Sequence, residues 1–177
     1  MFDPIYQLKH GNEQQKCAYR AISELEIMEN LSEFQPMLCG TFPLDIAVGG
    51  SDLDIIMEVH DFDQFETKVI RLYRGMEGFS RKRNIIRNVP IVKANFVFGG
   101  FEFELFGQPQ PTKKQNAYLH MIVEYHLIQA DPSIKGNILM LKEQGYKTEP
   151  AFCKVLGLDG DPYGALIEFG KTKNYIE

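Results

Sequence analysis

A change of hydrophobic period partway along the chain constrains its fold more than any other feature. From residue 79 the apolar side chains recur at every second position, which is the period of a half-buried strand. Gly99 and Gly100 interrupt this pattern as a hairpin turn would. The alternation predicts three consecutive strands, over about 79–86, 90–98 and 101–106.

Helical spacing dominates on both sides of these strands. Asn12 and Asp61 can cap helices, while Asp131 and Asp161 combine a cap with a proline at the first helical position. These signals predict four helices, over about 13–30, 61–74, 115–129 and 131–145. They also predict two shorter helices that start at about Thr148 and Asp161.

Two short apolar runs, at 37–39 and 53–59, predict further strands. The order is then helix, strand, loop, strand, helix, hairpin strands and a helical last third. A chain of 177 residues has the length of one domain. We therefore expect a single α+β domain over 1–177. Within it, a mixed sheet with helices on one side occupies about 1–110, and a helical segment occupies about 112–177.

The charge distribution narrows the class of partner. The net charge is −5, whereas nucleic-acid-binding domains are usually basic, so composition disfavours a long DNA or RNA. Between Arg71 and Lys93, however, seven basic residues accompany a single acidic one. A basic patch on an acidic chain suits a small polyanion.

Cysteine usage and hydropathy exclude other classes of protein. The three cysteines have no close spacing, which predicts neither a disulfide framework nor a zinc site. No apolar run approaches the length of a membrane span, and the first residues lack the apolar core of a signal peptide. We therefore expect a cytoplasmic protein without a membrane partner.

Asp52 and Asp54 are the strongest candidates for chemistry. They stand two residues apart at the start of a predicted strand, so the alternation of side chains places both carboxylates on one face. Paired carboxylates are typical ligands of Mg²⁺, and they repel each other unless a cation lies between them. The simpler alternative is a solvated entry to the strand.

Two neighbouring features strengthen the hypothesis of a metal site. Gly40 and Thr41 end the preceding strand, where a glycine allows a phosphate to approach and a hydroxyl can hold its oxygens. A third acid can come from the strand over 101–106, in which Glu102 and Glu104 face the same way. We favour Glu104, which is deeper in that strand, and keep Glu102 as the alternative.

These motifs together resemble the signature of the polymerase-β-like nucleotidyltransferase superfamily. The segments that carry the resemblance are 40–58, 104–108 and 115–121, so that it covers most of the chain from about residue 40. The run from Gln115 to Met121 resembles, more narrowly, a small bacterial family of unassigned function within that superfamily. The resemblance implies a mixed sheet flanked by helices, with the Gly40–Thr41 turn opening onto a metal site.

The resemblance also implies a reaction, the transfer of NMP from an NTP to a small-molecule or protein acceptor with Mg²⁺ or Mn²⁺ as the metal. Asp52, Asp54 and Glu104 would hold the metal and serve catalysis, and the nucleotide would bind at Gly40, Thr41 and Ser51. The alternative is a catalytically degenerate module of the same fold that binds a nucleotide, a metal or a partner. The ambiguous third acid and the lack of an evident acceptor domain favour that alternative.

Five further residues are candidates for acceptor or phosphate contacts. The resemblance suggests that Gln115, Asn116 and His120 face the cleft, although a satisfied core histidine is the simpler interpretation of His120. Arg81 and Lys82 belong to the basic segment and can steer a phosphate, or they form an ordinary solvated turn.

Overall fold

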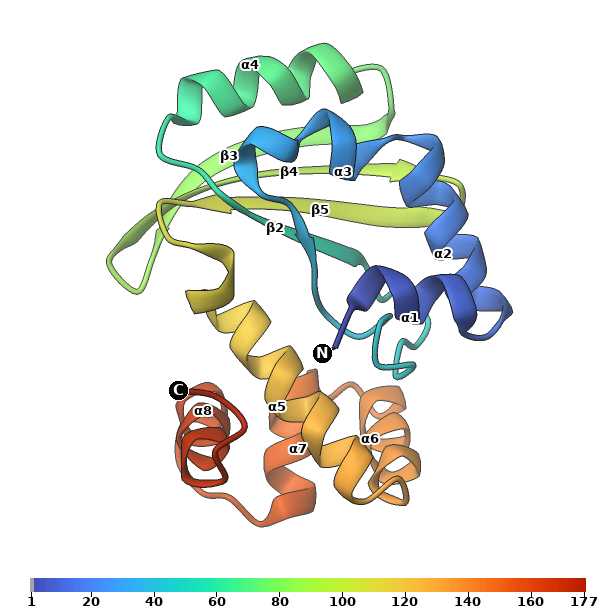
Figure 1. Cartoon of the computed structure of the whole chain (residues 1–177), viewed down its shortest axis with the longest axis vertical. Helices are drawn as coiled ribbons and strands as arrows, with labels where there is room; N and C mark the ends of the chain where they lie inside the picture. The colour runs from blue at the N-terminus through green and yellow to red at the C-terminus, as the bar shows by residue number, and fades with distance from the viewer. Residues whose placement is uncertain (1) are drawn as a thin grey trace.

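The computed structural model describes residues 2–177 and consists of a five-stranded mixed sheet with helices on both sides (Figure 1). The elements follow in the order α1 (Pro4–His10), α2 (Glu13–Glu24), α3 (Ile27–Asn30), η1 (Ser32–Phe34), β1 (Met37–Leu38), β2 (Leu53–Glu58), α4 (Phe62–Tyr73), β3 (Glu77–Ile86), β4 (Val89–Phe98), β5 (Phe101–Gln108), η2 (Thr112–Lys114), α5 (Asn116–Ala130), α6 (Ile134–Glu143), α7 (Thr148–Leu156) and α8 (Pro162–Thr172). The fold is the predicted α+β architecture.

The strand order across the sheet is β1-β2-β5-β4-β3. Only β2 and β5 run parallel, and the other neighbouring strands are antiparallel. The chain therefore leaves β2 through α4, adds the β3–β4 hairpin at the far edge, and returns with β5 beside β2. This return places two strands that are about fifty residues apart in the sequence next to each other.

Alternation along β2 and β5 divides the buried residues between two cores. Leu53, Ile55 and Met57 of β2 face a core that also contains Phe103 and Leu105 of β5 and the helices α2 and α4. The opposite face of β2 contributes Ile56 to a second core, which holds the buried residues of α5–α8. The carboxylates of Asp54 and Glu104 lie on this second face, because each is one residue out of phase with the first core.

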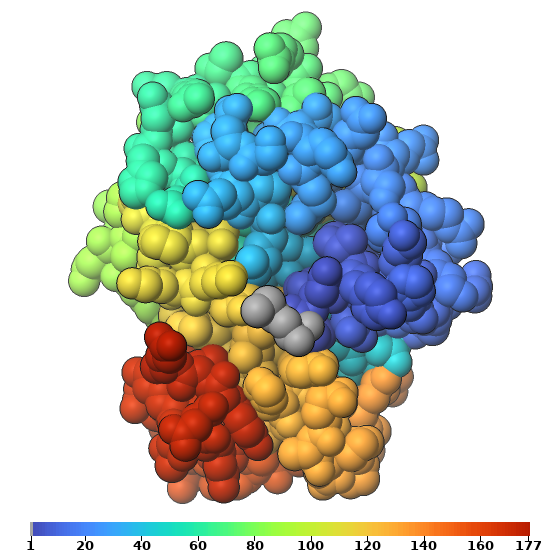
Figure 2. Space-filling view, in the orientation of Figure 1, coloured from blue at the N-terminus to red at the C-terminus, as the bar shows by residue number. Residues whose placement is uncertain are grey.

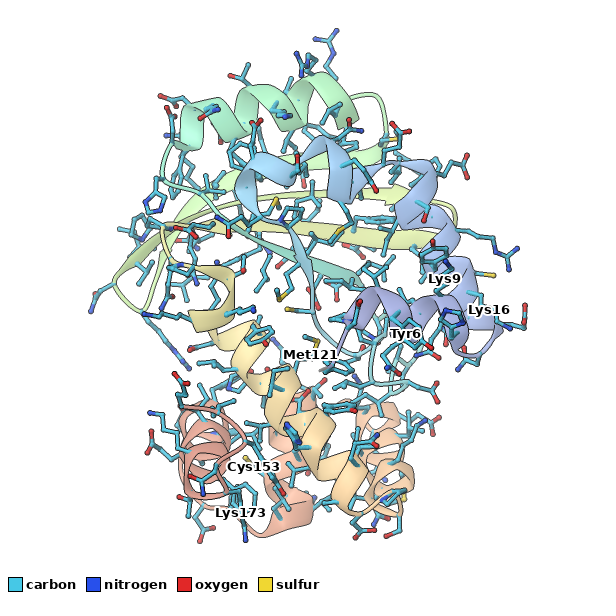
Figure 3. All side chains as sticks on the ribbon, in the orientation of Figure 1. Tyr6, Lys9, Lys16, Met121, Cys153 and Lys173 are labelled. Carbon is cyan, nitrogen blue, oxygen red and sulfur yellow. The ribbon has the colours of Figure 1, made fainter. Side chains whose placement is uncertain are left out.

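The helical segment packs below the sheet in the orientation of Figure 2, where residues 116–177 form the lower part of the molecule. Its helix α5 connects the two parts, and Met121, which is 1% exposed, lies on α5 where that helix enters the segment (Figure 3). Among residues 2–177, no helix is long and apolar enough to span a membrane.

The predicted helix over 13–30 is wrong as a single element. It divides into α2 and α3 at Glu26, whose backbone is left-handed with φ 48°. The physical reason is burial, because Ile22, Leu25 and Ile27 all enter the first core and no single straight helix can turn all three inward. The short helix α1, capped by Asp3, was not predicted although an aspartate followed by proline signals it.

The other helices and strands begin and end within a few residues of the predicted positions, except that α6 starts later than predicted. Asn12, Asp61 and Asp161 cap α2, α4 and α8 through their side chains, as predicted. The predicted start at Asp131 is wrong, because α6 begins at Ile134. The carboxylate of Asp131 instead accepts hydrogen bonds from Ser133, which closes a turn before the helix.

Candidate functional site

A cleft of about 680 Å³ lies between the second face of the sheet and the helical segment. One wall comes from β2, β5 and the loop over 40–52, and the opposite wall comes from α5 and the residues around the α6–α7 connection. The tip of the β3–β4 hairpin closes one end with Ile86, Arg87 and Val89. Cavities of roughly 300–1,000 Å³ are typical of small-molecule sites.

The parallel pairing of β2 with β5 brings two of the predicted acids together. Asp54 and Glu104 are direct partners in the register of the two strands, and both line the cleft. Asp52 precedes β2 by one residue and lines the same wall. Glu102 is exposed and outside the lining, so that of the two candidate acids of β5 it is Glu104 that lies in the cleft beside Asp54.

Gly40 and Thr41 form a tight turn directly above Asp54. Gly40 has φ +77°, and a Cβ added there would lie 2.3 Å from Oδ2 of Asp54, so only glycine fits without displacing the carboxylate. The carbonyl of Thr41 accepts hydrogen bonds from the amides of Leu44 and Ile46, both at 3.2 Å. These bonds close the loop on itself, while the amide of Cys39 donates to the Asp54 carbonyl at 2.8 Å and ties the start of the turn to β2. Thr41 lines the cleft.

Ser51 closes the other end of the same loop. Its Oγ accepts a hydrogen bond from the amide of Val48 at 3.0 Å, and its own amide donates to the Val48 carbonyl at 2.9 Å. Gly49, Gly50 and Ser51 all line the cleft. The predicted nucleotide-binding residues Gly40, Thr41 and Ser51 therefore share one wall with the acidic pair.

Burial disfavours the charged forms of Asp52 and Asp54. Burial, with the neighbouring charges of Asp52 and Glu104, raises the pKa of Asp54 to about 8. Burial also raises the pKa of Asp52, and the Glu104 carboxylate adds to this effect. Carboxylates held in this way gain most from a cation placed between them.

Glu104 is already engaged by basic and amide side chains from β4. Its Oε2 forms an ion pair with Lys93, and it accepts a hydrogen bond from Nδ2 of Asn95 at 3.4 Å. Within residues 2–177, no group of three or more His, Cys, Asp or Glu is close enough together to hold a metal ion. Asp52 and Asp54 fit a divalent cation by donor type, position and electrostatics, whereas Oε2 of Glu104 is already engaged by Lys93 and Asn95.

Gln115 and His120 on the helical wall use most of their polar atoms internally. Nε2 of Gln115 donates to the carbonyls of Met57 at 3.0 Å and Gln110 at 2.8 Å, which ties the start of α5 to β2, while its Oε1 is buried without a partner. Nε2 of His120 donates to the Tyr163 carbonyl at 2.9 Å. Both residues line the cleft, as does Asn116.

A second polar cluster, which the sequence reasoning missed, completes the helical wall. Nδ1 of His120 lies 3.3 Å from Oε1 of Glu149, and Nζ of Lys142 donates to Oγ1 of Thr148 at 3.0 Å. Burial lowers the pKa of His120, but the contacts with Glu149 and Tyr163 outweigh it, so that the pKa of His120 rises above its usual value. Glu124 lies one helical turn after His120 and is 3% exposed.

The two predicted phosphate contacts in the basic segment lie elsewhere. Arg81 pairs with Glu66 of α4 at 3.0 Å, and Lys82 is exposed on the edge strand β3, so that neither lines the cleft. The Lys and Arg side chains that do line it are Arg87, Lys142 and Lys147. No local sequence signal distinguishes these three from the other Lys and Arg residues of the chain.

Comparisons with known proteins agree with this fold. A family model described as "Domain of unknown function (DUF4269)" matches residues 20–169, which is consistent with the expected family of unassigned function. No curated protein matches the chain.

Among solved structures, the chain is similar to a Cid1 poly(U) polymerase bound to MgATP, with 16% identity, a TM-score of 0.54, and coverage of 92% of this chain and 52% of that one. It is also similar to the polymerase core of TRAMP, an RNA surveillance complex, with 12% identity, a TM-score of 0.53, and coverage of 98% and 56%. The Cid1 poly(U) polymerase bound to MgGTP gives 18% identity, a TM-score of 0.51, and coverage of 78% and 45%. The chain thus has a nucleotidyltransferase-like fold and spans about half the length of these structures.

Proposed function

The chain belongs to the DUF4269 family, and from this premise we propose that its cleft binds a divalent metal ion with a nucleoside triphosphate and transfers the nucleotidyl group to an acceptor. The observation that carries the proposal is the register of β2 and β5. It sets Asp54 opposite Glu104, with Asp52 on the same wall and the Gly40 turn directly above. In a nucleotidyltransferase-like fold, this is an arrangement that can hold a metal and a triphosphate together.

Each wall has a distinct part in the proposed reaction. Asp52 and Asp54 hold the metal, which supplies charge neutralisation at the reacting phosphate when it is bound. Amides and hydroxyls of the loop, from Gly40, Thr41 and Ser51, hold the phosphate oxygens. Lys142 lines the same cleft from the helical wall, where its charge acts on both Asp52 and Asp54.

The proposed step exchanges the phosphoanhydride bond between the α- and β-phosphates of the triphosphate for a phosphoester bond to the acceptor. The acceptor hydroxyl oxygen forms a bond to the α-phosphorus of the triphosphate, and the bond from that phosphorus to the β-phosphate oxygen breaks. Pyrophosphate leaves with the electron pair of the broken bond. The hydroxyl proton passes to a carboxylate, for which Glu104 is placed once it is released from Lys93.

A binding module without turnover is the second candidate, and one observation favours it. Lys93 forms an ion pair with Glu104, so that the charge of the third carboxylate is already neutralised beside the acidic pair. In such a module Asp52 and Asp54 still bind a metal with a nucleotide, but no group accepts the acceptor proton.

The test is the thermal stability of the wild type, Asp54→Asn and the exposed control Asp159→Asn with each NTP, with and without Mg²⁺. A ligand at about 100 times its Kd adds about 2.7 kcal/mol, which raises Tm by about 5–10 °C in a chain of this size. We expect a Mg²⁺-dependent rise in the wild type and in Asp159→Asn, and none in Asp54→Asn.

Absence of that rise with every NTP contradicts the proposed function. Where it occurs, transfer is measured with an NTP labelled at the α-phosphate, in the presence of a mixture of low-molecular-weight hydroxyl compounds. A labelled product that forms together with an equal amount of pyrophosphate supports the transferase. Binding without either product supports the second candidate.

A further inference from the structure

Two lysines lie directly opposite each other on the sheet, beside the candidate site. Lys82 of β3 and Lys93 of β4 are partners in the antiparallel register, so their side chains leave the same face of the sheet. Facing residues of this kind have Cβ atoms about 5 Å apart, and like charges at such positions are destabilising. The pair therefore costs free energy unless an anion lies between the two ammonium groups.

The face that carries these lysines is also the face that carries the acids of the cleft. Lys93 lies opposite Phe106 of β5, which lines the cleft two residues beyond Glu104. The side chains of Lys93 and Asn95 both reach Oε2 of Glu104, which places them on this side of the sheet. The lysine pair thus continues the second face beyond β5 and adjoins the cleft, although it lies outside the cleft lining.

The two lysines differ in the groups that already pair with them. Lys93 is 22% exposed and forms the ion pair with the third carboxylate. Arg81 and Arg83 leave the opposite face of β3, where both pair with Glu66 of α4. Lys82 stands between them in the sequence and is exposed, and within residues 2–177 its ammonium group takes part in no ion pair or hydrogen bond.

No further acid on these strands balances the lysine pair. The remaining acids on this face of β3, β4 and β5 are Glu77 and Glu102, and both lie opposite Val97. Val97 is four residues from Lys93 along β4, a separation of about 13 Å, and exposed charges that far apart are largely screened by salt. Two ammonium groups therefore share a single carboxylate, that of Glu104, and an anion between them would be stabilised.

The lysine pair is separated from the metal end of the cleft by two to three strands. Asp54, Glu104 and Asn95 follow one another across β2, β5 and β4. Lys93 is two residues along β4 from Asn95, so the backbone of the lysine pair lies about 12–16 Å from that of Asp54. An anion at the lysines is therefore remote from the reacting phosphate, and it can anchor a molecule whose other end reacts.

We propose that the acceptor carries a phosphate monoester, which Lys82 and Lys93 hold while a hydroxyl of the same molecule faces the metal end. This inference rests on the proposed function and names its substrate class, a small phosphorylated hydroxyl compound such as a sugar phosphate or a polyol phosphate. A monoester carries about −1.5 to −2 charges at pH 7, which matches two ammonium groups, whereas a phosphodiester carries only one negative charge. The net charge of −5 also disfavours a long polynucleotide as the acceptor.

The same contact prepares Glu104 for the proposed transfer. A phosphate beside Lys93 competes with Glu104 for the ammonium group. Oε2 of Glu104 is then less engaged and can accept the proton of the acceptor hydroxyl. Binding of the acceptor and release of the base are thereby coupled through Lys93.

The test compares matched probes that differ only in the phosphate. A mixture of sugar and polyol phosphates is compared with the same mixture after phosphatase treatment and removal of the released phosphate. A short oligoribonucleotide without a terminal phosphate supplies phosphodiesters alone. Each probe is added to protein saturated with Mg²⁺ and NTP. Transfer is measured with the α-labelled NTP, and Tm with an analogue that cannot be cleaved between the α- and β-phosphates.

The variants are Lys82→Met, Lys82→Arg and the control Lys9→Met, whose lysine is exposed on α1. We expect only the phosphorylated mixture to raise Tm and accept label. Lys82→Met should weaken its binding about tenfold, which raises KM and leaves kcat and NTP binding largely unchanged. Lys82→Arg keeps the positive charge and should retain most of the response, and Lys9→Met should retain all of it. Because Lys82 is exposed, added salt should weaken the wild-type response.

Three results overturn the inference while the proposed function stands, each in a protein that still shows the Mg²⁺–NTP rise. The first is an equal response to the phosphorylated and dephosphorylated mixtures, or to neither. The second is a response to the oligoribonucleotide alone, which would assign the lysines to phosphodiesters. The third is an unchanged response in Lys82→Met, which would leave Lys82 as a charge that only protects the edge of the sheet from pairing. Loss of the Mg²⁺–NTP rise from the wild type itself refutes the proposed function instead.

Discussion

Replacing Asp54 with Asn should stabilise the metal-free protein, and the gain should grow with pH. Burial raises the pKa of Asp54 from 3.8 to about 8 in the folded state. The unfolded chain therefore releases this proton more readily, and stability is lost as the pH rises from about 4 to about 8. Each pH unit in this window costs about 1.4 kcal/mol, which amounts to about 4 kcal/mol at pH 7.

The difference between the two proteins isolates this one carboxylate. Other groups titrate in the same range, such as Glu124, but they are present in both the wild type and Asp54→Asn. The assay is thermal unfolding in EDTA at pH 5, 6, 7 and 8, with Asp159→Asn as the control. We expect the Tm of Asp54→Asn to exceed that of the wild type by an amount that increases steadily with pH, by about 3–6 °C per unit.

Mg²⁺ should reduce the difference in Tm between the wild type and Asp54→Asn. The bound ion offsets the cost of a buried negative charge at Asp54, and the substitution eliminates that same cost. A variant that melts at or below the wild-type temperature from pH 5 to 8 would refute the reasoning. It would mean that Asp54 is compensated in the folded state by an interaction other than a bound cation.

Three further changes probe the same cleft. Gly40→Ala should lower the free energy of unfolding by about 1–2 kcal/mol and abolish the Mg²⁺–NTP rise in Tm, because its Cβ would meet the Asp54 carboxylate. The control Gly136→Ala lies in open space on α6 and should raise the free energy of unfolding by about 0.5–1 kcal/mol. Both are measured by chemical denaturation. Lys93→Met frees the third carboxylate, so calorimetry should find tighter Mg²⁺ binding; unchanged binding would show that this carboxylate does not reach the metal. Lys142→Met should weaken NTP binding about tenfold, and Lys82→Met, outside the cleft, should not alter it; equal effects would place the phosphates elsewhere.

Local periodicity predicted the strands and most helices, because each pattern depends on residues within a few positions of one another. The two-residue spacing of Asp52 and Asp54 likewise placed both on one face before any tertiary contact was considered. The same reasoning failed over 13–30, where the break at Glu26 comes from a core that local spacing does not describe.

The identity of the third acid illustrates a limit of another kind. Glu102 and Glu104 point the same way along β5, so alternation cannot separate them. The parallel pairing with β2 does, since it sets Glu104 beside Asp54 and leaves Glu102 exposed.

By itself, then, the sequence determined the fold class and one wall of the cleft, because strand alternation, helix caps and the Asp52–Asp54 spacing are encoded by neighbouring residues. Only the tertiary structure decided what faces that wall. The docking of α6 and α7 brings Lys142 and Glu149 to within electrostatic reach of acids that stand far earlier in the chain, and α5 adds Glu124 to the lining of the same cleft. It also leaves Arg81 and Lys82 outside the cleft. The positions of these side chains relative to the cleft arise from packing between distant segments. They therefore cannot be predicted from the period or spacing of residues along the chain.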